Sequence, residues 1–222
     1  MNKQTAIQTA FAQAMAATEE IPAKQKQVLA ASLALFAEQG FANTTTKEIA
    51  ERAGVAEGTV YRRYHTKEAL LAALLQPVVR QVVPTLMQEF AHQVMQQTYP
   101  SRRQFLQALL TNRAEFLQGN WREIKILLNE MLVRDDLRAT IIQEATPVLR
   151  DNLYPLLDHL RQAGELVAWP NDLVSQFLIG TVMTNLLRAN LQGDLRTFSQ
   201  RIPYLVDFLD RGLAPDQADN QN

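Results

Sequence analysis

The sequence predicts an all-α fold, in which an N-terminal three-helix helix-turn-helix domain precedes a longer C-terminal helical domain. Apolar residues recur at intervals of three and four along the chain, and no stretch alternates in the way that a half-buried strand requires. Between residues 45 and 64, two short helical patterns flank a glycine at position 54. Hydrophobic residues make up 47% of the 222 positions, which is ample for a buried core without disulfides.

The first helix of the N-terminal domain is expected to follow Pro22 and to end at Gly40. Proline is favoured at a helix start and glycine at a helix end, because of their backbone preferences. The inner face of this helix carries Val28, Leu29, Ser32, Leu35 and Phe36.

The second helix is expected to begin at Thr45. Thr45 and Glu48 have the spacing of a capping box, in which a hydroxyl and a carboxylate each satisfy a backbone amide of the first turn. Gly54 supplies the residue that most cheaply adopts a left-handed conformation where a helix ends. The inward face of this helix carries Ile49, Ala50 and Ala53.

The third helix should start at about Glu57 and bury Val60 and Tyr64, which are four residues apart. Its outer face then carries Thr59, Tyr61, Arg62 and Arg63. No acidic residue occurs from Gly58 to Lys67. Hydroxyls, a phenol and guanidiniums on a short helix can meet phosphates and base edges in a major groove. We therefore interpret this face as a DNA-binding surface.

The two arginines are the better candidates for a base edge, because a guanidinium can pair bidentately with guanine. The remaining polar groups are expected mainly at phosphates. The complete set of predicted DNA-contacting residues is Thr45, Thr46, Lys47, Glu57, Gly58, Thr59, Tyr61, Arg62, Arg63, His65 and Lys67.

The order of small and aromatic residues in this region resembles the DNA-binding domain of TetR-type (tetracycline-repressor-like) transcriptional regulators. The resemblance rests on the runs 36–41, 49–55, 58–61 and 66–68 and on the aromatic at Tyr64, and covers roughly residues 22–82. It implies a homodimeric regulator, commonly a repressor of a palindromic operator, whose DNA affinity falls when a small molecule binds. Glu57 and the Arg62-Arg63 pair depart from the common pattern, so the operator sequence does not carry over.

Net charge by itself gives little support for DNA binding, because the chain is formally −1 at pH 7. Residues 1–70 contain 8 Lys and Arg against 7 Asp and Glu. Attraction to phosphates must therefore come from a local patch rather than from a basic domain. That patch consists of Lys47, Arg62, Arg63 and Lys67.

Residues 1–21 form an N-terminal extension outside the family resemblance, with Ile7, Phe11 and Met15 at helical spacing. A marginal helix or mobile tail is one interpretation; a helix packed on the body, or an arm near the DNA, is the alternative. After the helix-turn-helix, a long helix is expected with Thr66 as its cap. Pro77 and Pro84 should kink that helix.

Residues 83–214 are predicted to form a helical regulatory and dimerisation domain, followed by a tail at 215–222. Ser101 with Gln104, and Asn120 with Glu123, have capping-box spacing. Pro147 and Pro155 should kink or split one helix, and two further helices are expected at about 171–191 and 195–213. Gly119, Gly164 and Gly193 are expected at helix ends.

An enzyme is not expected. The chain has no cysteine, its three histidines lack metal-ligand spacing, and no nucleophile elbow or phosphate loop is present. We expect no metal and no cofactor. No apolar run is expected to reach the length of a membrane span, so the sequence predicts a soluble, cytoplasmic protein.

Aromatic residues and methionines of the helical body could line an effector pocket or simply form the core. The resemblance favours a pocket, and the composition suggests a mostly apolar effector with few polar anchors. The candidates are Phe90, Phe105, Phe116, Trp121, Met131, Tyr154 and Phe177.

The last two predicted helices carry more apolar surface than a terminal hairpin normally buries, which predicts a two-fold dimer. The candidate interface is Val174, Phe177, Leu178, Thr181, Val182, Asn185, Ile202, Leu205, Val206 and Leu209. The competing hypothesis is a helical ligand-carrying or protein-interaction module without DNA binding. The acid-free outer face of the third helix argues against it, because such a face has no evident folding benefit.

Overall fold

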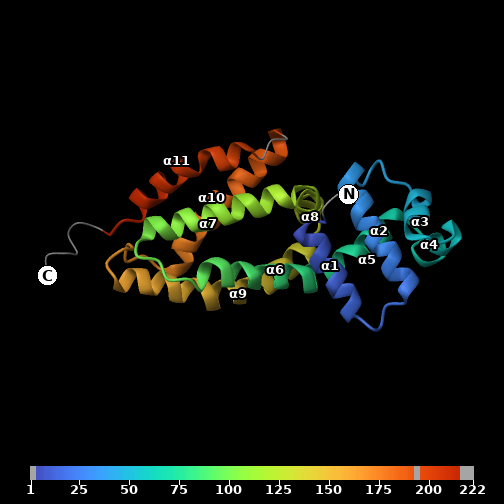
Figure 1. Ribbon diagram of the computed structural model, residues 1–222, viewed down its shortest axis with the longest axis horizontal. Coiled ribbons are helices and arrows are strands. Elements are labelled where there is room, and N and C mark those ends of the chain that lie inside the picture. Colours follow the sequence, from blue (N-terminus) through green and yellow to red (C-terminus); the bar gives the residue numbers. More distant parts are fainter. Residues whose placement is uncertain (1–3, 193–195, 216–222) are drawn as a thin grey trace. The chain divides into compact units, whose positions relative to one another are not determined.

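The computed structural model describes residues 4–192 and 196–215, and within these ranges every element of regular structure is helical (Figure 1). The prediction of an all-α fold is therefore confirmed. The α-helices are α1 (Ala6–Ala17), α2 (Ala23–Gln39), α3 (Thr46–Ala53), α4 (Glu57–Arg63), α5 (Lys67–Pro77), α6 (Val83–Phe90), α7 (Arg102–Gly119), α8 (Trp121–Val133), α9 (Asp135–Gln162), α10 (Asn171–Gln192) and α11 (Arg196–Gly212). Two π-helical segments, η1 (Val78–Val82) and η2 (Ala91–Met95), lie on either side of α6.

The chain divides into two compact units. The first contains residues 1–87 and 120–145, and the second contains residues 88–119 and 146–222. Helix α8 and the start of α9 therefore belong with the N-terminal helices, although they follow α7 in sequence. The predicted boundary after residue 82 separates a DNA-binding domain from a regulatory domain, and these are defined by function and not by packing. That boundary stays a prediction.

The core of the first unit contains the predicted inner face of α2. Val28, Leu29, Ser32, Leu35 and Phe36 are all buried, and α2 ends where Gly40 follows it, as predicted. The edge of the Phe36 ring meets the Phe41 ring with centroids 5.2 Å apart, which fixes the turn after α2.

Helix α1 is a packed part of the first unit. Of the alternatives considered for the N-terminal extension, a helix packed against the rest of the protein therefore describes residues 6–17. Its side chains Ile7, Phe11 and Met15 are buried, and α1 contacts α2, α5 and η1. These contacts supply the tertiary packing that a helix of this length needs, because short isolated helices are marginal in water.

Polar contacts also hold α1 to the start of α8. The backbone amide of Ile7 donates to Asn120 Oδ1 at 2.9 Å, and Gln8 Nε2 donates to Glu123 Oε1 at 2.6 Å. The predicted capping box of Asn120 and Glu123 is therefore wrong, since Asn120 makes no side-chain cap bond to α8. Both side chains are almost fully buried and are used by a helix more than a hundred residues earlier in the chain.

The prolines inside the expected helices behave differently from one another. At Pro77 the α-helical hydrogen-bond pattern gives way to the π-helix η1, which relieves the lost bond without ending the helical path, and Pro84 follows as the second residue of α6. Pro147 and Pro155 lie inside one continuous helix, α9, so of the two predicted alternatives, a kink or a split, the split is wrong. Buried leucines on α9 hold it to the second unit, and this packing offsets the missing hydrogen bonds.

The helical stretch Lys67–Met95 is long and apolar enough to cross a membrane by length and composition alone. The expectation that no run reaches that length is therefore wrong. Core helices of globular proteins meet the same criterion, and Leu70, Leu71, Leu74 and Val79 of this stretch are buried.

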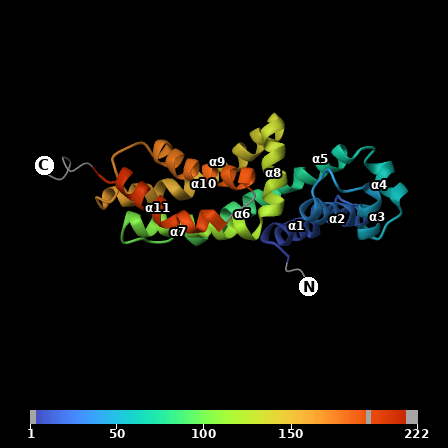
Figure 2. The same ribbon diagram turned by 90° about the horizontal axis from the view of Figure 1, so that it is seen from above.

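The second unit is built on α7 and α11, which lie side by side in two views (Figures 1 and 2). Arg102 Nε donates to Asp210 Oδ1 at 2.9 Å in a largely buried ion pair, and the same guanidinium reaches the carbonyl of Glu165. The ring of Tyr99 lies 5.6 Å from that of Phe105. Helix α10 packs on both α7 and α11.

Candidate nucleic-acid interface

The first helix of the helix-turn-helix, α3, is fixed at its start by the predicted capping box. Glu48 N donates to Thr45 Oγ1 at 3.2 Å, and Thr45 N donates to Glu48 Oε2 at 2.8 Å. The backbone amide of Thr45 holds the pKa of the Glu48 carboxyl below its ordinary value, and the Thr45 hydroxyl adds to this effect. The charged carboxylate therefore stabilises the first turn of α3.

A bidentate ion pair fixes α3 against α2. Arg52 Nη1 and Nη2 donate to the two carboxylate oxygens of Glu38 at 2.8 and 2.7 Å. These hydrogen bonds lower the pKa of Glu38, although burial acts in the opposite direction. Both side chains are partly exposed, so the pair orients the helices more than it stabilises them.

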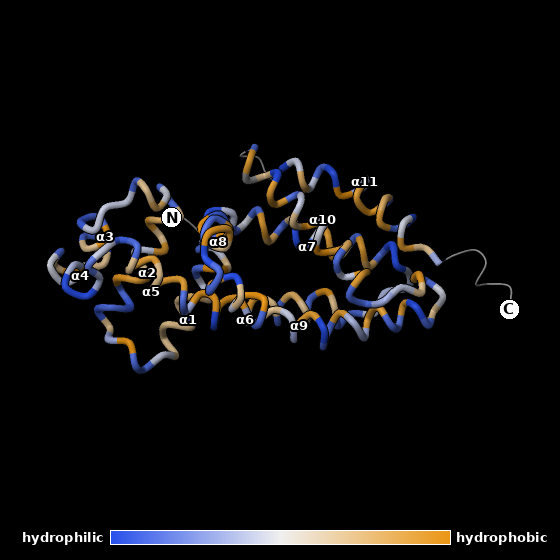
Figure 3. The backbone as a smooth tube through the Cα atoms, turned by 180° about the vertical axis from the view of Figure 1, so that it is seen from behind, coloured by the Kyte–Doolittle hydropathy of each residue, from blue (hydrophilic) through white to orange (hydrophobic). Residues whose placement is uncertain are grey.

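The turn and the second helix follow the prediction closely. Gly54 has φ 65° and ψ 35°, the left-handed conformation that a glycine adopts without strain. Val60 of α4 is fully buried and Tyr64, the residue directly after α4, is 6% exposed, while Tyr61 is 60% exposed. Arg62 and Arg63 are exposed as well, and Figure 3 draws α4 mostly in hydrophilic colours. We call Thr59, Tyr61, Arg62 and Arg63 the reading face.

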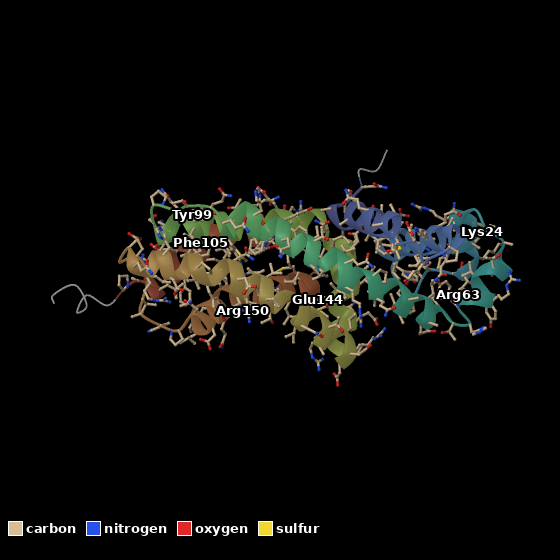
Figure 4. All side chains as sticks on the ribbon, turned by 90° about the horizontal axis from the view of Figure 1, so that it is seen from below. Lys24, Arg63, Tyr99, Phe105, Glu144 and Arg150 are labelled. Carbon is tan, nitrogen blue, oxygen red and sulfur yellow. The ribbon has the colours of Figure 1, made fainter. Side chains whose placement is uncertain are left out.

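The structure adds Lys24 to the candidate surface. Lys24 and Arg63, both labelled in Figure 4, line one hollow together with Gln25, Thr59 and Arg62. The sequence interpretation missed Lys24, although a signal was present. The first turn of α2 carries lysine and no acid, and a cation is unfavourable at the positive end of a helix unless an anion lies close by.

Lys67 is placed differently from the prediction. Its Nζ donates to the carbonyls of Phe41, Ala42 and Thr44 at 2.7, 3.2 and 3.0 Å, and lies 4.5 Å from the centroid of the Phe41 ring. An ammonium group has three N–H donors. The side chain therefore closes the loop between α2 and α3, and a role as a phosphate contact is not supported by its position.

Two other members of the predicted set are engaged with the protein itself. The Thr45 hydroxyl belongs to the capping box, and the Thr46 hydroxyl donates to Glu57 Oε1 at 3.4 Å across the starts of α3 and α4. The side chains of Lys47 and His65 are accessible to solvent, as is Gly58. The assignment of these residues to DNA stays a prediction.

The candidate effector residues fall into both units. Trp121 and Met131 belong to the first unit, whereas Phe90, Phe105, Phe116, Tyr154 and Phe177 belong to the second. Phe105 is 1% exposed and is part of the core, and Phe177 is 43% exposed, with its ring 5.9 Å from that of Trp169. Phe90 and Phe116 both lie against one arginine, Arg113.

Most of the candidate dimer residues are buried within the second unit. These are Val174, Leu178, Val182, Asn185, Ile202, Val206 and Leu209; Thr181 and Leu205 are less buried, and Phe177 is exposed. The helical periodicity of the sequence correctly indicated helices with apolar surface. The side chains that we chose from it as a dimer interface, however, mostly face the core of the second unit. The exposed apolar side chains lie on a neighbouring face, which includes Leu173, Phe177, Ile179, Met183, Leu187, Leu191, Tyr204 and Phe208.

Helices α2 to α4 thus form a three-helix unit, in which α3 and α4 are the helix-turn-helix and α4 presents an exposed polar and basic face. Residues 28–74 match the family described as bacterial regulatory proteins, tetR family. The chain is 46% identical over 50 residues to YvkB, an uncharacterized HTH-type transcriptional regulator of Bacillus subtilis (strain 168), and 32% identical over 80 residues to the HTH-type transcriptional regulator HbdR of Aromatoleum sp. (strain CIB).

These two alignments cover 22% and 36% of this chain, and only 26% and 33% of the relatives. Solved structures show a longer likeness. FadR from Bacillus subtilis in complex with stearoyl-CoA has a TM-score of 0.60 at 20% identity, over 84% of this chain and 98% of that one. A putative TetR-family regulator from Mesorhizobium loti MAFF303099 has a TM-score of 0.62 at 16% identity, over 86% of this chain and 97% of that one.

At such identities the structural likeness shows the fold, while the sequence matches concern the N-terminal domain. Residues 28–74 therefore carry the DNA-binding domain found in TetR-family helix-turn-helix transcriptional regulators, and the whole chain shares the fold of solved members of that family. The relatives matched by sequence are named as transcriptional regulators, which is the class of protein that the sequence analysis expected.

Proposed function

We propose that the protein is a cytoplasmic transcriptional repressor that binds an inverted-repeat operator as a homodimer and leaves it when a small, mostly apolar effector binds. The observation that carries the proposal is the reading face of α4. It is open to solvent, it contains two guanidiniums, and its residues are held outward by the buried Val60 and Tyr64. A short helix of this kind enters a major groove with its side chains at the base edges.

The surroundings of the reading face suit a phosphate backbone. Lys24 lies at the same hollow as Arg62 and Arg63, and Lys47 is accessible on α3. Such cations position a protein on DNA without reading its sequence. Arg62 or Arg63 is proposed to read a guanine, and Lys24 and Lys47 are proposed to contact phosphates.

The dimer is proposed to form through the exposed apolar face of α10 and α11, because the residues that the periodicity selected are mostly used by the unit's own core. On α10 the positions 173, 177, 180, 184, 187 and 191 follow one another at spacings of four and three, which is the seam of paired helices. On α11, Tyr204 and Phe208 are 77% and 72% exposed. A monomer rarely leaves such a contiguous apolar face in water. A two-fold axis through it would place two reading faces on the half-sites of an inverted repeat.

The effector is proposed to be an acyl compound bound by the second unit. FadR from Bacillus subtilis, which shares the fold, was solved in complex with stearoyl-CoA. A ligand that binds better to a conformation with displaced reading faces lowers operator affinity by the same factor by which DNA lowers ligand affinity.

A gel-shift assay with DNA from upstream of the protein's own gene tests the proposal. We expect a shift that is competed by the same fragment but poorly by unrelated DNA, and that is abolished in a double variant Arg62→Ala with Arg63→Ala. Glu19→Ala with Glu20→Ala, on an exposed segment before α2, is a matched control. A helical carrier module would show no specific shift, and retention of the shift in the double arginine variant would place DNA binding elsewhere.

A further inference from the structure

A guanidinium of the second unit lies against two phenyl rings and not against an acid. Arg113, on α7, is half-buried, and its Cζ lies 3.5 Å from the centroid of the Phe90 ring and 4.9 Å from that of Phe116. In the part of the chain that the structure describes, no carboxylate forms an ion pair with Arg113. Arg102 and Arg161 of the same unit, by contrast, each pair with an aspartate.

The hydrogen bonds of Arg113 leave one edge of the guanidinium unused. Its Nε and Nη2 donate to the side-chain oxygen of Asn112 at 3.1 and 2.5 Å, and Asn112 Nδ2 donates to Gln93 Oε1 at 2.8 Å. The amide of Asn112 is thereby fixed, and it holds the guanidinium in one orientation. Within residues 4–192 and 196–215, Nη1 has no hydrogen-bond acceptor, so the end-on fork of Nη1 and Nη2 holds no protein oxygen.

A cation in this position is unfavourable for the protein alone. Burial lowers the pKa of Arg113 to about 10, because the charged form loses contact with water. The faces of the two phenyl rings recover part of that loss, but a ring is a weaker partner than a carboxylate. An apolar side chain of similar size would fit the same place at a lower cost.

We propose that Arg113 binds the anionic head of the effector, a carboxylate or a phosphate on an alkyl chain. The inference rests on the proposed function, since it concerns the effector of the same regulator. The open fork matches two oxygens of such a head, which is the geometry that guanidiniums recognise bidentately. Phe116, which is partly exposed beside the guanidinium, would give the first carbons of the chain an apolar surface.

The test uses four ligands that share a twelve-carbon chain and differ only in the head: dodecanoate, dodecyl phosphate, dodecan-1-ol and dodecylamine. Binding to the full-length protein is measured by calorimetry and by thermal shift, below the micelle concentration and without DNA. We expect one of the two anions to bind about 10- to 100-fold more tightly than the alcohol, and the amine to bind no better than the alcohol. The tighter anion identifies the head as a carboxylate or a phosphate.

Variants separate recognition from packing. Arg113→Met should lose the preference for the anion but keep the weak binding of the alcohol, and without ligand it should melt at a higher temperature than the wild type. Arg113→Gln, which keeps hydrogen-bond donors, should also lose the preference. Arg150→Gln is the control, because Arg150 is an exposed arginine of the same unit that pairs with Asp151.

Three results would overturn the inference: an alcohol bound as tightly as both anions, an anion bound equally well by Arg113→Met, or no binding of either anion. A lower melting temperature of unliganded Arg113→Met would also count against it, because it would show a structural role. The proposed function fails separately. It would fail if the anions bound through Arg113 while the protein gave no specific gel shift.

Discussion

The role of Lys67 can be tested by substitution, because loss of a phosphate contact weakens DNA binding whereas loss of contacts to the loop between α2 and α3 lowers stability. The sequence predicts that Lys67 contacts a DNA phosphate, but in the structure its ammonium group binds three carbonyls of this loop. We consider Lys67→Met, which keeps the approximate length of the side chain and removes the ammonium group. In the wild type this group closes the loop between α2 and α3. In the variant three carbonyls lack their donor, and the Phe41 ring lacks its cation.

The expected decrease in stability follows from these interactions. A hydrogen bond to a charged group contributes about 1.5–3 kcal/mol, and a cation over an exposed ring contributes about 0.5–1 kcal/mol. The hydrogen bond to the carbonyl of Ala42 is exposed, so water can replace it, whereas those to Phe41 and Thr44 are partly buried. The net effect is therefore about 2–3 kcal/mol, which corresponds to a decrease of roughly 4–12 °C in Tm for a protein of this size.

The assay combines thermal unfolding with the salt dependence of operator binding. Lys67→Met should melt lower than the wild type and keep the wild-type salt slope at temperatures where it is folded. Lys47→Met, on the accessible side of α3, should melt normally and reduce the slope by about one, the value for a single neutralised phosphate. The reasoning would be refuted by a Lys67→Met protein that melts with the wild type and has the smaller slope.

Three other substitutions test the remaining parts of the site. Arg62→Ala should weaken binding to the preferred operator by roughly 1–3 kcal/mol and hardly affect random DNA, as measured by competition gel shift; equal weakening on both would remove Arg62 from the base contacts. Phe177→Glu should give a folded monomer in sedimentation equilibrium, while Gln107→Glu, exposed on α7 and not on either of the proposed interface helices, should stay dimeric; a dimeric Phe177→Glu would place the interface elsewhere. The pKa of Glu48 is lowered in the folded protein, so its stabilising effect is present above the ordinary pKa of a glutamate and is lost as the pH falls through the lower folded pKa. The difference in Tm between wild type and Glu48→Gln should therefore shrink on acidification below about pH 4.5, and a constant difference from about pH 6 to about pH 3 would contradict the capping role.

The helix-turn-helix could be predicted from the sequence because its determinants are local. A capping box involves residues three apart, and Gly54 needs only its own backbone conformation to end α3. The burial of Val60 and Tyr64 follows from helical periodicity within one helix. Each of these signals lies inside a window of a few residues, where pattern and structure are directly linked.

The features that could not be predicted depend on partners far away in the chain. Asn120 has the sequence context of a helix cap, yet its acceptor is used by the amide of Ile7. Lys67 has the context of a phosphate ligand, yet its donors are used by a loop more than twenty residues earlier. Periodicity likewise found apolar surface on α10 but could not tell the face turned to α7 and α11 from the one turned to solvent.

Helix α1 has a consequence for moving the DNA-binding domain between proteins. The family match spans residues 28–74, so a chimera made at its borders would carry most of α2 to α5 and leave out α1 and α8. The graft would lack the buried Phe11 and Met15 of α1, while in the donor body left behind α1 would stay bonded to Asn120 and Glu123 but lose most of the α2 on which it packs. In this protein the portable piece is therefore larger than the sequence signature of its family, and an exchange of operator specificity is better made by substituting the reading face than by exchanging the domain.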